Sequence, residues 1–179
     1  MKPCRYVAFL RGVNVGGRVV KMAALKTLFE AMKFECVETF IASGNVIFTS
    51  KGAKSTLESR IETALERALG YRVSVFLRTP DEIATIAARN PFDRPLPAGG
   101  RLFVAMVRVS PPVTVRKKVA ALSTSSDEFI VVGREVYWRC AVPSMKSIMS
   151  GNTLEKALMQ PATLRNVNTL RRLAERYPA

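Results

Sequence analysis

Strand-like and helix-like segments alternate along the first 78 residues in an order that is compatible with few folds. Runs of aromatic and β-branched residues predict strands at 6–11, 37–42, 46–49 and 73–78. Apolar residues spaced three or four apart predict helices at about 22–32 and 55–69. The resulting order, β-α-β-β-α-β, is that of the split βαβ or ferredoxin-like unit.

Short local motifs predict where several helices begin and end. Ser55 and Glu58 have the spacing of a capping box at the start of the second helix, and Gly70 is suited to end that helix. Thr79, followed by Pro80 and Glu82, predicts the start of a further short helix. This helix should run to about residue 89, before an Asn-Pro step.

The same order of elements is predicted a second time after residue 100. Strands are expected at 102–109, 129–132, 136–139 and, more weakly, 162–166, with helices at 115–122, 152–159 and 169–177. A loop containing Pro95, Pro97, Gly99 and Gly100 is expected to divide the two halves. We therefore predict an α+β fold of two tandem βαββαβ ferredoxin-like units. The first covers 1–79, and the second covers 80–179 with an extra leading helix and a C-terminal helix.

The sequence contains no histidine, which removes several kinds of chemistry. A Ser-His-Asp triad, a Cys-His pair and a histidine-ligated metal are all excluded. The three cysteines, Cys4, Cys36 and Cys140, form no CxxC pair and favour a reducing compartment over a disulfide framework. We predict no metal and no cofactor. Whether the protein is an enzyme stays open, because Asp, Glu, Lys, Tyr or Cys could serve as acid or base if strongly tuned.

The chain is strongly basic, with 28 Lys and Arg against 14 Asp and Glu, a net charge of +14. Residues 1–79 hold 13 basic and 6 acidic residues, and residues 80–179 hold 15 and 8, so each part carries +7. Such a charge favours an anionic partner such as nucleic acid, a nucleotide or an acidic protein. The alternative is a solvated basic surface without a partner.

No segment resembles a targeting signal or a membrane span. The apolar run at 6–10 ends at Arg11, too short for a signal peptide. No stretch approaches the roughly 20 apolar residues that cross a bilayer. We therefore expect a cytoplasmic protein without a membrane partner, and the sequence leaves its oligomeric state open.

A glycine-containing loop leads from the first predicted strand into the first predicted helix. Glycines let the backbone approach a ligand closely, and free N–H groups at a helix start attract anions. The spacing matches neither a P-loop nor GxGxxG, so the loop indicates an anion and not specifically a nucleotide. Alternatively, the glycines of this loop serve only to let the backbone adopt the conformation that the turn requires. The candidate ligand-binding residues here are Arg11, Asn14, Gly16 and Gly17.

Two further polar segments are candidates for the same site. One lies between two predicted strands, where a plain hairpin turn is the alternative: Ser43, Gly44 and Asn45. The other precedes the last predicted helix, where Asn168 or Thr169 could instead be the N-cap: Arg165, Asn166, Asn168 and Thr169.

Several longer segments resemble a known bacterial family. RGVNVGG at 11–17, KMAALKTLFEAMKF at 21–34 and FIASGNVIF at 40–48 are similar to the domain of unknown function family 1697, as are GREVYWRC and ATLRNVNTLRRLA nearer the C-terminus. The resemblance covers nearly the whole chain, implies two tandem ferredoxin-like units and implies no particular activity. It also favours a functional role for the polar residues named above, which match the family's recurring positions. The sequence departs from the family pattern at Arg139, where histidine is common, at Val167, which replaces a tryptophan, and at 145–147, which replace a Gly-Arg-Ser-like step.

Our leading hypothesis is the binding of a phosphate-bearing ligand, nucleic acid or nucleotide, where the three polar segments converge. The backbone amides of Gly16 and Gly17 would hold the phosphate, and Arg11 and Arg165 would pair with it. The side chains of Asn14, Asn45 and Asn166 would fix its orientation. One alternative is an enzyme acting on a small anionic substrate, with the same residues stabilising charge. Another is a protein–protein adaptor that uses its sheets.

Overall fold

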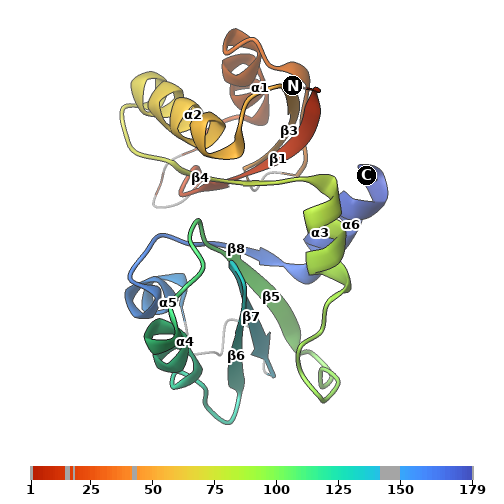
Figure 1. Ribbon diagram of the computed structural model, residues 1–179, viewed down its shortest axis with the longest axis vertical. Coiled ribbons are helices and arrows are strands. Elements are labelled where there is room, and N and C mark those ends of the chain that lie inside the picture. Colours follow the sequence, from red (N-terminus) through yellow and green to blue (C-terminus); the bar gives the residue numbers. More distant parts are fainter. Residues whose placement is uncertain (1, 15–16, 18, 42–43, 142–149, 179) are drawn as a thin grey trace. The chain divides into compact units, whose positions relative to one another are not determined.

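The computed structural model describes residues 2–14, 17, 19–41, 44–141 and 150–178 (Figure 1). The chain forms two compact units, Met1–Ile83 with Arg176–Ala179, and Ala84–Glu175. Each unit contains one four-stranded antiparallel sheet and the helices that pack on it. The predicted fold of two tandem ferredoxin-like α+β units is confirmed.

The first unit has the β-α-β-β-α-β order that the sequence predicts. Its elements are β1 (Cys4–Arg11), α1 (Met22–Ala31), β2 (Glu35–Thr39), β3 (Asn45–Ser50), α2 (Lys54–Leu69) and β4 (Ser74–Arg78). The strands lie in the order β2-β3-β1-β4, so the first and last strands of the unit are neighbours and β4 is at an edge.

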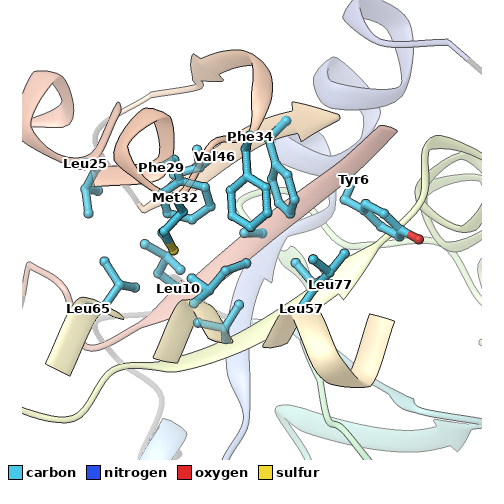
Figure 2. Close-up of a cluster of buried hydrophobic side chains, with 14 of the residues drawn as sticks. Tyr6, Leu10, Leu25, Phe29, Met32, Phe34, Val46, Leu57, Leu65 and Leu77 are labelled. Atoms are coloured by element: carbon cyan, nitrogen blue, oxygen red, sulfur yellow. The ribbon is translucent and has the colours of Figure 1, made fainter. Parts of the chain in front are cut away.

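The core of the first unit lies between its sheet and helices α1 and α2. Alternate residues of β1 point to one face of the sheet, and there they pack against apolar residues of both helices (Figure 2). An aromatic group stabilises this core: the rings of Phe34 and Phe48 are 4.4 Å apart, and Phe29 meets Phe48 edge-on at 5.5 Å. Burying each such side chain stabilises the fold by about 1.5–3 kcal/mol.

The predicted capping box at Ser55 is wrong. Helix α2 begins at Lys54 after Ala53, which makes no side-chain cap. Glu58 is buried and its Oε1 accepts the backbone N–H of Leu77 at 2.9 Å. One turn later, Glu62 Oε1 accepts the N–H of Val75, also at 2.9 Å. Because β4 is an edge strand, its outward N–H groups need acceptors, and these carboxylates supply them in place of a cap.

Two other helix-end predictions are confirmed. Gly70 ends α2 in the left-handed conformation, with φ of 77°, and its N–H donates to the backbone carbonyl of Glu66 at 2.9 Å. Thr79 caps α3 (Pro80–Ala88): its N–H donates to Glu82 Oε2 at 2.8 Å, and the N–H of Glu82 donates to Thr79 Oγ1 at 3.3 Å. This reciprocal pair is a capping box.

The second unit repeats the fold. Its elements after α3 are β5 (Arg101–Met106), α4 (Val113–Ala120), β6 (Asp127–Val132), β7 (Glu135–Cys140), α5 (Gly151–Leu158), β8 (Thr163–Asn166) and α6 (Val167–Arg176). The sheet order is β6-β7-β5-β8, which corresponds strand for strand to the first unit. The weakly predicted fourth strand is real, although it is only four residues long and pairs with β5.

Helix α6 ends with residues that group with the first unit. The hydroxyl of Tyr177 donates to Glu38 Oε2 on β2 at 2.8 Å. The Tyr177 ring also meets Phe40 edge-on, with the ring centroids 6.4 Å apart. Arg176, the last residue of α6, is grouped with Tyr177 in the first unit, and the rest of α6 is grouped with the second unit.

Candidate anion-binding site

The second unit contains a pocket of about 300 Å³ beside the junction of β8 and α6. Its walls come from the loop before β5, from β5 and β7, and from the first turns of α6. The polar side chains that line it are four arginines and three asparagines: Arg94, Arg101, Arg139, Arg171, Asn90, Asn166 and Asn168. The remaining lining residues are apolar or glycine, so the lining that the structure describes carries positive charge and no carboxylate.

Arg139 is the most buried charged group of the pocket. It lies on β7, paired with Leu102 of β5 on one side and Glu128 of β6 on the other, and is only 6% exposed. Its Nη2 donates to the carbonyl of Pro95 at 2.8 Å, and its Nη1 is 3.9 Å from Glu128 Oε2. The buried Nε–H finds no acceptor among the described residues. A buried donor without an acceptor costs about 1–3 kcal/mol, and more when charged, so this group is suited to bind an incoming acceptor.

The loop between α3 and β5 forms one wall of the pocket. The sequence predicted this Pro- and Gly-containing loop only as a divider of the two halves. In the structure its Pro95 carbonyl holds Arg139, and its Arg94 side chain pairs with Glu128 of β6. At its end, Arg101 Nη1 donates to the carbonyls of Gly99 and Gly100 at 3.3 and 3.2 Å. The loop therefore belongs to the second unit and shapes its pocket.

The start of α6 forms the opposite wall. Strand β8 runs directly into the helix, and Asn166 Oδ1 accepts the N–H of Asn168 at 2.9 Å (Figure 1). Asn166 is therefore the N-cap, and the predicted helix start with Asn168 or Thr169 as cap is wrong by two residues. Arg171 Nη1 donates to Asn168 Oδ1 at 3.2 Å. Free backbone N–H groups and the helix dipole make such a terminus favourable for an anion.

Arg165 and Thr169 belong to the same segment but do not line the pocket. Arg165 Nη1 donates to Thr163 Oγ1 at 2.9 Å and to the carbonyl of Leu164 at 2.8 Å. Desolvation lowers the pKa of the Arg165 guanidinium to about 10, still far above neutral pH. Thr169 is half-buried on α6. Of the four predicted residues, the pocket brings together Asn166 and Asn168.

The other predicted residues lie in the first unit. Asn14 is exposed, and its Oδ1 accepts the N–H of Val20 at 2.7 Å; Arg11 is half-buried and Gly17 is exposed. Asn45 is fully buried, and its Nδ2 donates to the carbonyl of Phe40 at 3.0 Å. Gly44 has φ of 68°, and an added Cβ there would lie 3.2 Å from Leu10 Cβ, which favours glycine in this turn. Gly16 and Ser43 fall outside the described residues, and a site shared by all three segments stays a prediction.

Five of the seven polar lining residues were not predicted as site residues. Asn90, Arg94 and Arg101 belong to no motif and are surrounded by other polar or loop residues, and Arg171 lies in the family-like segment 162–174 among other basic and polar residues. Arg139 did stand out as a departure from the family pattern. Its burial depends on a loop 44 residues earlier in the chain, which periodicity does not predict.

Other kinds of site find no support in the part of the chain that is described. Among these residues, no three or more Cys, Asp or Glu side chains gather in a way that could hold a metal ion. None of the three cysteines forms a disulfide within the described residues. None of the described helices is both long enough and apolar enough to cross a membrane.

Two antiparallel sheets with the same crossed strand order define this chain as a tandem ferredoxin-like α+β protein. The chain belongs to the family described as "Protein of unknown function (DUF1697)", whose model matches residues 4–137. The family resemblance seen in the sequence is thereby confirmed. Arg139 and α6 lie beyond the matched residues, so the family match says nothing about this part of the pocket.

The chain is also similar in structure to a conserved bacterial protein from Streptococcus pneumoniae. The TM-score is 0.69 at 22% sequence identity, over 97% of this chain and 98% of that one. At this level of identity the similarity extends to the fold alone. None of the curated proteins compared with the chain matches it.

Proposed function

We propose that the second unit binds a small phosphate-bearing anion in the pocket between the 90–100 loop and the start of α6. The observation that carries this proposal is Arg139, a buried guanidinium whose Nε–H has no acceptor among the described residues. Buried charged groups are normally fully paired, and an orphaned donor beside a cavity calls for a ligand that accepts hydrogen bonds.

The other lining residues support an anionic ligand. Arginines form charge-assisted, often bidentate bonds with phosphate that are roughly twice as strong as neutral ones. Three further arginines reach the same pocket, and Asn90, Asn166 and Asn168 contribute side-chain amides that can orient a ligand. The volume of about 300 Å³ is at the lower end of the range for ligand pockets, roughly 300–1,000 Å³, which favours a small molecule over a polymer.

The lining favours binding over acid–base catalysis. Its described polar side chains are arginines and asparagines, none of which exchanges a proton near neutral pH. An enzyme acting here would depend on electrostatic stabilisation alone.

Calorimetric titration with sodium phosphate, at constant ionic strength in chloride buffer, tests the proposal. Arg171→Gln should weaken phosphate binding about tenfold or more, because a charge-assisted bond contributes about 1.5–3 kcal/mol. Arg172→Gln is the matched control, since it removes the same charge from the next position of α6, which does not line the pocket. Absence of phosphate binding by the wild type, or equal losses in the two variants, would overturn the proposal.

A second variant addresses Arg139 itself. Arg139→Gln should abolish measurable phosphate binding, and circular dichroism shows whether the variant still folds. Where it does not fold, the comparison of Arg171→Gln with Arg172→Gln decides the question by itself.

A further inference from the structure

Glu128 on β6 lies between two of the pocket arginines without lining the pocket itself. One carboxylate oxygen pairs with Arg94 of the loop, and the other is 3.9 Å from Arg139 Nη1. Its side chain is 26% exposed, so this carboxylate is partly shielded from solvent screening. Glu128 therefore connects two walls of the pocket and offsets part of their positive charge.

The carboxylate acts on the same donors that a ligand would use. A carboxylate and a phosphate both accept bonds from guanidinium groups, so Glu128 occupies part of the donor capacity of Arg94 and Arg139. Glu128 does not engage the Nε–H of Arg139, which is buried and has no acceptor among the described residues, nor Arg171, Arg101 and the start of α6. This set can bind one phosphate group. A second phosphate group would add negative charge close to Glu128, where like charges repel.

Apolar residues are spread over the same walls as the arginines. Phe92 and Leu96 come from the loop, Leu102 from β5 and Val167 from the start of α6. Apolar walls stabilise an uncharged part of a ligand by removing it from water. A phosphate joined to a compact, uncharged body satisfies both kinds of lining residue, whereas a diphosphate leaves the apolar side chains uncovered.

We propose that the pocket takes a small phosphate monoester, and that Glu128 is the residue that excludes ligands with a second phosphate group. This inference rests on the proposed function and goes further, since it specifies the class of ligand and the residue responsible for selectivity. Glu128 acts through Arg94 and Arg139 and is therefore a positioning and selectivity residue. Removing its charge should admit pyrophosphate.

Three probes test the inference by calorimetry: inorganic phosphate, phenyl phosphate and pyrophosphate. The wild type should bind phenyl phosphate most tightly and pyrophosphate most weakly. In Glu128→Gln, the affinity for pyrophosphate relative to phosphate should rise about tenfold or more, a change of about 1.4 kcal/mol. Asp93→Asn is the matched control, because Asp93 is exposed, neighbours Arg94 in the chain, and loses the same charge. It should leave the ratio nearly unchanged.

The outcomes separate this inference from the proposed function. Phosphate binding with an unchanged pyrophosphate ratio in Glu128→Gln would overturn the role of Glu128 and leave anion binding intact. Tighter binding of pyrophosphate than of phosphate by the wild type would do the same, even if the variant failed to fold. Failure of the wild type to bind phosphate or phenyl phosphate would overturn both.

Discussion

The two units have the same topology, yet each contains a buried arginine that is used differently. In the first unit Arg78 lies on β4, is fully buried, and donates from Nη1 to the carbonyl of Leu77 at 2.9 Å. Its positive charge also helps to lower the pKa of Glu82. In the second unit Arg139 lies on β7 and keeps one donor without an acceptor among the described residues. We therefore expect a structural role for Arg78 and, under the proposed function, a binding role for Arg139, and a shared fold predicts neither role.

The largest expected effect is on stability, in a comparison of Arg78→Met with Arg139→Met. Arg78→Met should lower the free energy of unfolding by about 3 kcal/mol, because breaking a buried, paired charge leaves its partners unsatisfied. Arg139→Met should cost about 1 kcal/mol or less, since it also removes an unsatisfied buried donor. Urea denaturation measures both values. An equal loss in the two variants would contradict the distinction.

The second comparison concerns the fourth strand of each unit. Glu58 bonds the backbone of β4, and in the second unit Glu155 on α5 accepts the N–H of Ala162, just before β8, at 2.7 Å. Glu58 is buried, whereas Glu155 is half-buried. Glu58→Ala should therefore lower the free energy of unfolding by about 2 kcal/mol, and Glu155→Ala should lower it by about 1 kcal/mol. Denaturant unfolding measures the difference, and a reversed order would show that burial does not control these bonds.

The third prediction separates binding in the pocket from binding through the net positive charge of the whole chain. Phosphate affinity should fall less than about tenfold between 50 and 200 mM salt, because few charges are involved and the site is partly buried. An oligonucleotide that is bound through six or more phosphate contacts would lose about a thousandfold or more of its affinity over the same range of salt concentration. Fluorescence anisotropy with a labelled oligonucleotide, beside the phosphate titration, measures both. A steep salt dependence for phosphate would place its binding on the exposed surface.

The smallest expected effect is the pH dependence contributed by Glu82 in the first unit. Burial tends to raise the pKa of Glu82, but bonds from Lys54 and from the Thr79 N–H outweigh it, so its pKa is lowered from 4.5. A lowered folded-state pKa stabilises the protein above the unfolded value, and this contribution is lost as the pH falls through the folded value. The stability difference between the wild type and Glu82→Gln should therefore shrink below about pH 4.5. Its pH-dependent part should be under about 1 kcal/mol, measured by denaturation at several pH values.

The sequence predicted the order of strands and helices because that order depends on local periodicity. The errors occurred where a distant group competed with a local motif. The carboxylate of Glu58 bonds an edge strand 19 residues later and therefore cannot close a capping box. Asn166 caps α6 because β8 enters the helix without a loop, which leaves Asn168 inside the helix.

The pocket was the hardest feature to predict. Arg139 follows Trp138 in an alternating strand, and alternation indicates only that the two side chains point to opposite faces. Whether the face with Arg139 is open or covered depends on the 90–100 loop, whose proline- and glycine-rich sequence fixes no conformation by itself. Asn166 and Asn168 were predicted because they lie at a helix start, where local chemistry suffices, whereas Asn90 lies in the loop and was missed.

Helix α6 affects the order in which the protein can fold. It begins at the pocket, and the residue after its end, Tyr177, bonds Glu38, which is 139 positions earlier in the chain. During synthesis, residues 1–83 therefore leave the ribosome long before Tyr177 can complete their surface. Contacts of such high sequence separation form slowly, because a long loop must close before they stabilise the chain. The first unit is thus the first to be synthesised and the last to be completed, and until then the surface around Phe40, the residue after β2, lacks its Tyr177 contact and stays open to misassembly.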